Sequence, residues 1–199
     1  MIEDLELKNI LSESIQSNQL NLNQAINLSK KIINGVNVKY IDPFSLKPNS
    51  KGKFGLGIPT GSIRRKNKTI NDIDILITDI ILPEKFEKLS EFVEFIERGK
   101  DKLSFYYLPD RQIRVDIRFL KDLRSFGAML LRTTGPWDYN RNLSKIAKDQ
   151  GLLLNEYGVF KNNKYIAGET EQDVYQAIKT SKFPKGKKWT PPELRGKEW

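Results

Sequence analysis

Two segments of the chain alternate apolar and polar residues, as a half-buried β-strand does. In residues 72–77 the three isoleucines fall on one face of the predicted strand, and Asp72 and Asp74 fall on the other, roughly 7 Å apart at Cα. Residues 111–120 repeat the alternation and place Asp116 on the polar face, between two arginines. If these strands pair side by side, three carboxylates share one surface of a sheet.

Five other segments carry apolar residues at the spacing of an α-helix. The third of these helices is expected to stop at Gly135-Pro136, because this pair disfavours helix continuation. Residues 34–53 are rich in Asn, Pro, Ser, Gly and Lys and predict a loop, and residues 1–17 suit a short helix. The five helices are expected over residues 22–33, 83–98, 123–131, 140–150 and 171–179.

The remaining strand signals predict one further strand and two hairpins. Pro109-Asp110 would join the strands of the first hairpin, and the sequence Asn-Glu-Tyr-Gly at 155–158 would join those of the second. The expected strand covers residues 54–60, and the expected hairpins pair residues 102–108 with 111–120 and residues 152–154 with 159–161.

These elements group into two lobes of an α+β fold. We expect an N-terminal extension over residues 1–19, and a lobe over residues 20–122 with a mixed β-sheet and helices on one side of it. Residues 123–199 predict a smaller α/β lobe. A chain of 199 residues can bury one good core together with such an appended lobe.

Composition narrows the chemistry more than it narrows the fold. The chain has no histidine and no cysteine, which excludes an imidazole base, a thiol nucleophile and Cys- or His-ligated zinc. A bound metal must have oxygen ligands, which favours Mg²⁺ or Mn²⁺. The formal charge of +9 suits a polyanionic partner. No apolar run is long enough to span a membrane, and the acidic start is unlike a signal peptide, so we expect a soluble intracellular protein.

The three carboxylates suit a site for two divalent metal ions. Phosphoryl transfer can use two such ions about 4 Å apart, which activate the attacking hydroxyl and neutralise the leaving group. Asp72 and Asp74 could bridge both ions, and Asp116 could bind one of them and receive the proton of the attacking hydroxyl. The alternative is that the Asp-Ile-Asp sequence is only a solvated strand face.

The segment before the first of these strands suits a phosphate group. Gly61 lets backbone N–H groups approach a ligand, Ser62 offers a hydroxyl and could cap a brief helix, and Arg65 could form a bidentate contact to phosphate oxygens. The alternative is a plain serine N-cap followed by solvated arginines.

Taken in order, these motifs resemble those of family X DNA polymerases, over roughly residues 20–199. The Gly-Ser-Ile-Arg-Arg sequence at 61–65, the Asp-Ile-Asp sequence at 72–74 and the Arg-Val-Asp-Ile-Arg sequence at 114–118 resemble the family's palm, a nucleotidyltransferase subdomain. Three further motifs resemble the family's thumb. They are Thr134-Gly135 with Tyr139-Asn140-Arg141, Leu154-Asn155-Glu156-Tyr157-Gly158, and Trp189-Thr190-Pro191-Pro192-Glu193-Leu194-Arg195.

The resemblance implies a template-directed DNA polymerase that fills short gaps in duplex DNA during base-excision-type repair. It implies dNTP substrates, gapped or nicked duplex DNA as partner, a monomer, and two Mg²⁺ ions for which Mn²⁺ can substitute. The implied metal ligands and catalytic residues are Asp72, Asp74 and Asp116. The implied nucleotide-binding residues are Gly61, Ser62, Arg65, Arg132, Thr133, Thr134, Gly135 and Asn140.

Contacts to DNA are expected from basic residues in both lobes. Arg114 would position Asp116 or a primer phosphate, and Arg141 would contact the templating strand. The lysines of the predicted helix 140–150 and of the C-terminal tail suit phosphate contacts, and they equally suit a solvated surface. The expected DNA-binding residues are Arg114, Arg141, Lys145, Lys148, Lys185, Lys187 and Lys188.

The chain also departs from the family pattern and most resembles its short, palm-plus-thumb viral members. Arg132-Thr133 stands where many members carry an aromatic pair before Thr-Gly, which implies weaker rejection of ribonucleotides and low fidelity. No lysine can be assigned to the removal of 5′-deoxyribose phosphate, so we expect no lyase activity. Two alternative functions stay open, namely a template-independent nucleotidyltransferase and a non-catalytic DNA-binding protein with a relict palm.

Overall fold

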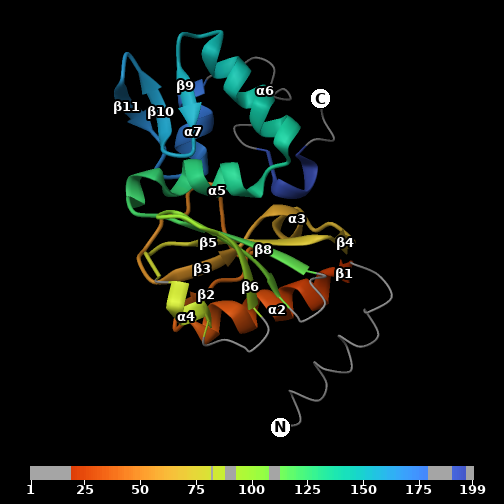
Figure 1. The fold of residues 1–199 in the computed structure, drawn as a ribbon. Helices are drawn as coiled ribbons and strands as arrows, with labels where there is room; N and C mark the ends of the chain where they lie inside the picture. The colour runs from red at the N-terminus through yellow and green to blue at the C-terminus, as the bar shows by residue number, and fades with distance from the viewer. Residues whose placement is uncertain (1–18, 82, 88–92, 108–112, 179–189, 196–199) are drawn as a thin grey trace.

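The computed structural model describes residues 19–81, 83–87, 93–107, 113–178 and 190–195, which form two stacked lobes (Figure 1). The palm lobe is built on a six-stranded sheet with the strand order β2-β3-β5-β8-β7-β6. Its β2–β3 and β5–β8 pairs are parallel and the other pairs are antiparallel. In the order of the sheet, the strands are Lys39–Tyr40, Leu56–Pro59, Asp72–Ile77, Ile113–Phe119, Lys102–Tyr107 and Val93–Arg98.

Two helices cover the lower face of this sheet, α2 (Leu22–Gly35) and α4 (Pro83–Glu87) (Figure 1). The first begins at a capping box, in which the Asn21 side chain accepts from the Gln24 N–H and the Gln24 side chain accepts from the Asn21 N–H. A two-stranded sheet of β1 (Leu20–Asn21) and β4 (Thr69–Ile70) lies at the start of α2. The isoleucines of β5 and the apolar residues of β8 pack into this lower core, as the alternation predicts.

The thumb lobe begins with a short 3₁₀ turn and the helix α5, and its helices pack around a three-stranded sheet in the order β11-β10-β9. None of the helices in the described parts of the chain is long and apolar enough to cross a bilayer. The thumb elements are η1 (Leu123–Ser125), α5 (Phe126–Thr134), α6 (Trp137–Lys148), β9 (Leu153–Asn155), β10 (Gly158–Lys161), β11 (Lys164–Ala167), α7 (Glu171–Ile178) and η2 (Pro192–Leu194).

The helix α5 belongs to the cores of both lobes. One side of it, including Phe126 and Leu130, packs against Leu76 on the upper face of the palm sheet. Its other side, including Ala128 and Leu131, packs into the thumb core. A helix buried on opposite sides must be apolar almost all round. Leu76 lies on the same face of β5 as Asp72 and Asp74, so α5 covers the sheet where the acidic residues end.

The α+β class, the mixed sheet and most elements are confirmed, and one predicted helix is wrong. Within the range 83–98, residues 83–87 form α4 and residues 93–98 form the strand β6, which pairs with β7 from Val93↔Tyr107 to Arg98↔Leu103. Phe95 packs on Phe105, and the pairing satisfies the free edge of β7. Helical spacing failed here because two shorter elements share the same apolar periodicity.

Smaller differences concern short pairings and element ends. The strands β1, β2, β4 and β11 were not expected, because two to four residues carry too little periodicity to reveal a strand. The helix expected over residues 140–150 begins at Trp137 and ends at Lys148. The helix expected in residues 1–17 and the turn at residues 109–110 lie outside the described residues. The lobe boundaries at residues 19 and 122 stay predictions.

The packing of α4 gives a stability prediction. Phe86 is completely buried, and its ring contacts those of Phe105 and Phe119 at centroid distances of 6.1 and 6.3 Å. Phe86→Ala should lower the free energy of unfolding by about 3–5 kcal/mol in urea titrations, because it leaves a cavity under the sheet. Phe54→Ala, at a side chain that is 59% exposed, should change it by less than about 0.5 kcal/mol. Equal losses in the two variants would contradict this account of the core.

Candidate active site

The parallel pairing of β5 with β8 brings the acidic residues together. In its register, Asp74 lies directly beside Asp116 and Asp72 lies beside Arg114. The inward residues of both strands are fully buried in the lower core, which fixes the aspartates on the upper face. The structure therefore places the three predicted carboxylates on one surface, facing the thumb.

The carboxylate of Asp116 already has two protein partners. Arg114 lies two residues away on the same strand, and its Nε and Nη2 lie 3.0 and 3.1 Å from the two Asp116 oxygens. Ser104, opposite Asp116 on β7, donates its hydroxyl hydrogen to Asp116 Oδ1. Sequence analysis did not identify Ser104, although the alternation in residues 102–107 would have placed it on the acidic face.

Asp74 lies against the start of the helix α3 (Gly61–Arg64). A Cβ atom at Gly61 would lie 1.9 Å from Asp74 Oδ2, and Gly61 has a φ of +50°. Both the positive φ and the lack of space explain why glycine is needed here. Burial, together with repulsion from Asp72 and Asp116, raises the pKa of Asp74 to about 7, although Arg65 and Arg114 partly offset this effect.

The donor set suits a divalent cation, although the carboxylates are not already gathered around one position. Within the described ranges, no three acidic side chains are close enough together to form a metal cluster. Like charges repel, and Asp116 instead takes Arg114 and Ser104 as partners. The chemistry nevertheless fits Mg²⁺. Repulsion from Asp72 and Asp116 contributes to the raised pKa of Asp74, and a cation would relieve this repulsion. Carboxylate oxygens are also the ligands that Mg²⁺ prefers. Asp72, Asp74 and Asp116 are the residues that could hold it.

Two hydroxyl groups beside these carboxylates have no hydrogen-bond partner. Thr60 Oγ1 and Ser62 Oγ are both buried and unpaired. Thr60, and not Ser62, is the N-cap residue of α3, and its side chain makes no capping bond. The prediction that Ser62 caps a helix was therefore wrong, because the helix already starts at Gly61 and Ser62 lies within it. Buried hydroxyls without partners are costly, so their presence here favours a ligand with acceptor oxygens.

Arg64, the last residue of α3, and Arg65, the C-cap of this helix, contact different partners. Arg65 Nη1 donates to the Thr134 carbonyl oxygen at 2.5 Å, and Gly135 lies close to the same nitrogen. Burial lowers the pKa of Arg65, while Asp74 and Asp72 act in the opposite direction. Arg65 therefore lies between the acidic residues and the Thr134-Gly135 turn. The alternative that this arginine is simply solvated does not hold.

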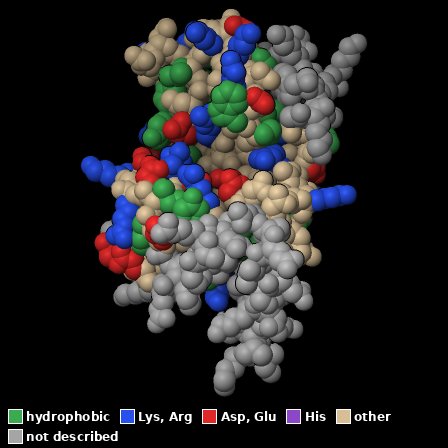
Figure 2. Space-filling model, turned by 45° about the vertical axis from the view of Figure 1, so that its right-hand side comes forward, with side chains coloured by type: hydrophobic (Ala, Val, Ile, Leu, Met, Phe, Trp, Pro, Cys, Tyr) green, Lys and Arg blue, Asp and Glu red, His purple; other side chains and the backbone are tan. Residues whose placement is uncertain are grey.

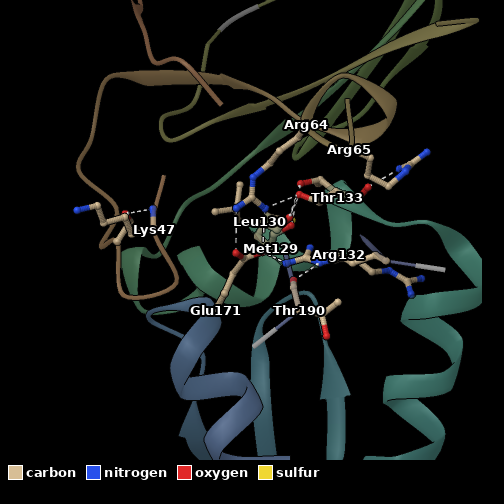
Figure 3. A network of polar contacts seen from close by, with 12 residues as sticks. Lys47, Arg64, Arg65, Met129, Leu130, Arg132, Thr133, Glu171 and Thr190 are labelled. Atoms are coloured by element: carbon tan, nitrogen blue, oxygen red, sulfur yellow. Dashed lines mark hydrogen bonds and ion pairs between the residues drawn. The ribbon is translucent and has the colours of Figure 1, made fainter. Parts of the chain in front are cut away.

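Arg64 lies at the centre of a buried ionic network between the lobes (Figure 3). Its Nη1 and Nη2 donate to the two Glu171 carboxylate oxygens at 2.8 and 2.9 Å, and Nη1 also donates to Thr134 Oγ1. Arg195 Nη2 donates to Glu171 Oε1 at 2.9 Å, and Arg195 Nε donates to the Thr190 carbonyl. The sequence offered one hint of this network, the Thr-Pro-Pro-Glu-Leu-Arg motif that ends in Arg195.

A cleft of about 250 Å³ opens between the acidic surface and α5. Figure 2 shows acidic and basic side chains together in the hollow between the lobes. Asp74 and Asp116 line the cleft with Arg132 and Thr133, so these predicted nucleotide-binding residues do gather at the site. Two further cationic residues, Lys102 and Arg118, also line it and were not identified from the sequence.

The other predicted residues lie along the helix α6 or outside the described residues. Asn140 is buried and donates its side-chain amide to the Arg132 carbonyl at 2.8 Å. Arg141 is exposed, with its guanidinium 5.2 Å from the ring centroid of Trp137. Lys145 and Lys148 are exposed on the same helix. Lys185, Lys187 and Lys188 lie outside the described residues.

The buried network gives a prediction for stability against pH. Burial would raise the pKa of Glu171, but Arg195 and Arg64 outweigh it and hold the pKa at about 2, below the usual 4.5. The ionised Glu171 therefore stabilises the fold fully above about pH 4.5, and this contribution is lost as the pH falls toward 2. Removing this contribution with Glu171→Gln should flatten the acid limb of the unfolding free energy by about 3 kcal/mol, measured in urea titrations.

At neutral pH the same variant leaves two buried guanidinium groups without their carboxylate, which should cost about 3–5 kcal/mol. Glu169→Gln is the matched control, because Glu169 pairs with Lys51 at the surface and is 46% exposed. It should keep the wild-type acid limb. A Glu171→Gln acid limb as steep as that of the wild type would show that the network is not the source of the effect.

Comparisons with known proteins agree with this geometry. The family model described as "DNA polymerase beta thumb" matches residues 129–196. Repair DNA polymerase X of African swine fever virus, Pretoriuskop isolate, is 32% identical over 142 residues, which cover 64% of this chain and 79% of the viral protein. The DNA polymerase/3′-5′ exonuclease PolX of Bacillus subtilis is 32% identical over 102 residues, half of this chain but only 18% of the bacterial protein.

A solved structure shares the fold. The Leishmania infantum polymerase beta, in a crystal structure described as a ternary P/T complex, has a TM-score of 0.64 and 19% sequence identity. The match covers 89% of this chain and 76% of that chain. The viral relative is similar over most of its length, and both lobes of the polymerase beta fold are present. This chain therefore belongs to family X of the DNA-directed DNA polymerases.

Proposed function

We propose that the protein fills short gaps in duplex DNA by template-directed addition of dNTPs, in the manner of a repair polymerase. The observation that carries this proposal is the side-by-side register of Asp74 and Asp116, with the unpaired Ser62 hydroxyl and Arg65 at the helix α3 that adjoins Asp74. Carboxylates for a metal and donors for a phosphate thus come from neighbouring elements of the palm. The similarity to a repair DNA polymerase supports the same function.

Two Mg²⁺ ions, when bound, would activate the primer 3′-hydroxyl and neutralise the leaving pyrophosphate, and Mn²⁺ has similar ligand preferences. Asp72, Asp74 and Asp116, which share one face of β5 and β8, are the residues that would hold these ions. Asp116 also accepts the proton of the hydroxyl, directly or through a water molecule. Arg114 fixes the orientation of this carboxylate through two contacts at 3.0 and 3.1 Å.

The incoming triphosphate would contact α3 and the end of α5. Gly61 leaves room for it, Ser62 donates its unpaired hydroxyl, and Arg65 provides the charge. Thr134 and Gly135 would lie beside the sugar, and Asn140 would reach the edge of the base. Because Arg132 and Thr133 replace an aromatic pair at the cleft, we expect weak discrimination against ribonucleotides and low fidelity.

The duplex would lie along the basic side of α6. Arg141, Lys145 and Lys148 are exposed on this helix, and Arg141 reaches the templating strand. Arg114 is exposed at the acidic face, where a primer phosphate would approach. Contacts of this kind fix the position of the duplex without reading its sequence.

A gapped duplex tests the proposal directly. With Mg²⁺ and single dNTPs, the wild-type protein should add the one nucleotide that is complementary to the template. Asp116→Ala should reduce the rate by several orders of magnitude, because it removes a metal ligand and the proton acceptor. Asp149→Ala, at an exposed carboxylate at the end of α6, should keep the rate. Extension that ignores the template would favour a template-independent transferase, and DNA binding without extension would favour a non-catalytic role.

Binding to DNA should weaken steeply as salt rises, because each phosphate contact releases counterions. In a plot of log affinity against log salt concentration, Arg141→Ala and Lys145→Ala should each reduce the slope by about 1. Lys85→Ala is the control, since Lys85 is exposed on α4, on the face of the palm away from the thumb. A slope that is the same in all four proteins would rule out phosphate contacts by α6.

A further inference from the structure

Ser104 is a small, polar residue on the acidic face of the palm sheet. It lies within β7 and is completely buried. Its neighbours Leu103 and Phe105 belong to the lower core, so the Ser104 side chain lies on the upper face. The antiparallel register of β7 with β8 places it directly opposite Asp116. A buried hydroxyl needs a hydrogen-bond partner, and this register supplies one.

Asp116 lies between a repulsive and an attractive neighbour. In the registers of β5 and β7 with β8, Asp74, Asp116 and Ser104 form one row across three adjacent strands. Side chains opposite one another on adjacent strands are close enough to interact. Asp74 repels Asp116 from one side. From the other side, Ser104 donates its hydroxyl hydrogen to Asp116 Oδ1, because an ionised carboxylate can only accept. This hydrogen bond holds Oδ1 at β7.

The partners of Asp116 are distributed unequally between its two oxygens. Oδ1 accepts from the Ser104 hydroxyl and, at 3.1 Å, from Arg114 Nη2. Each carboxylate oxygen has about two acceptor sites, so Oδ1 has no free site left. Oδ2 contacts Arg114 Nε at 3.0 Å, and it has no further partner within the part of the chain that the structure describes. Oδ2 is therefore the oxygen that can still bind another group.

The two partners of Asp116 differ in how firmly they hold it. The Arg114 side chain is 45% exposed, and an exposed ion pair contributes little because water competes for both charges. Arg114 is also proposed to contact a primer phosphate, which would compete with Asp116 for the guanidinium. Ser104 is excluded from solvent and is fixed by the strand pairing. Its hydroxyl is therefore the partner for which neither solvent nor DNA competes.

We propose that Ser104 is a positioning residue, which holds Asp116 Oδ1 and thereby leaves Oδ2 as the oxygen that this aspartate offers to a divalent cation. Groups that hydrogen-bond to a metal ligand orient it, and their loss typically lowers metal affinity or activity by about 10–100-fold. Ser104 itself contacts neither DNA nor nucleotide and acts only through Asp116. The inference rests on the proposed function, because there Asp116 is a metal ligand.

Binding of Mn²⁺ tests the inference without relying on turnover. The protein is mixed with a gapped duplex whose primer ends in a dideoxynucleotide and with the matching dNTP, and bound Mn²⁺ is measured by electron paramagnetic resonance. Ser104→Ala should weaken Mn²⁺ binding at one site by about tenfold, because Asp116 loses the contact that orients it. Ser104→Thr keeps the hydroxyl and should restore most of this affinity. Ser29→Ala, the matched control, should bind Mn²⁺ as the wild type does, since Ser29 is equally buried but donates to the Ala25 carbonyl in α2.

Steady-state extension with Mg²⁺ gives a second readout. In Ser104→Ala, kcat should fall by about tenfold, and KM for the dNTP should stay unchanged, because the proposed nucleotide contacts lie on other elements. A purely structural role would lower the free energy of unfolding in Ser104→Ala and leave the Mn²⁺ affinity as it is. Alanine is smaller than serine, so this variant should fold, and it decides the question if threonine does not fit.

The outcomes separate this inference from the proposed function. Mn²⁺ binding in Ser104→Ala that is as tight as in the wild type, or tighter, overturns the inference, because the hydroxyl then has no effect or competes with the cation. Ser104→Thr with wild-type stability and the weak binding of Ser104→Ala overturns it as well. Asp116→Ala with wild-type Mn²⁺ binding contradicts the metal site of the proposed function. Weaker binding in Asp116→Ala but not in Ser104→Ala contradicts only the positioning role.

Discussion

The arrangement of the two lobes depends on one buried ionic network, in which Glu171 lies between Arg64 and Arg195. The first arginine comes from the palm helix α3, the carboxylate from the thumb helix α7, and the second arginine from the segment next to η2. Such a network stabilises only while it is complete, because any member left alone would be a buried, uncompensated charge. It therefore specifies one relative position of palm and thumb more sharply than apolar contacts could.

This constraint also determines the geometry of the candidate active site. Neighbouring residues of a helix point in different directions, so fixing Arg64 between the lobes aims Arg65 elsewhere. Arg65 reaches the Thr134 carbonyl at the edge of the cleft, and the Thr134 hydroxyl accepts from Arg64. The end of α5 thus contacts both Arg64 and Arg65. Arg64, which has a structural role, therefore positions Arg65, which is proposed to bind the triphosphate.

The acidic residues on the upper face of the sheet differ from this network, because their charges repel one another. The lower-face residues of β5 and β8 fix three carboxylates on one face of the sheet, and burial with mutual repulsion raises the pKa of Asp74 to about 7. Arg114 and Ser104 contact Asp116 directly, whereas Arg65 and Arg114 only partly offset the raised pKa of Asp74. The fold thus holds charges that repel one another where bound cations would relieve the repulsion. A carboxylate whose pKa is strongly perturbed in a cleft marks a candidate functional site.

The sequence by itself determined the local structure wherever periodicity was strong. Alternation in residues 72–77 and 113–119 was enough to predict both acidic strands and the face on which their carboxylates lie, because strand side chains alternate strictly. Only the tertiary structure decided which elements meet. Residues 93–98 became a strand because the edge of β7 was available for pairing, and Arg64 became buried because Glu171, 107 residues later, reached it. The contact between Arg65 and the Thr134 carbonyl, 69 residues apart, likewise joins segments that are far apart in the chain, which no local pattern encodes.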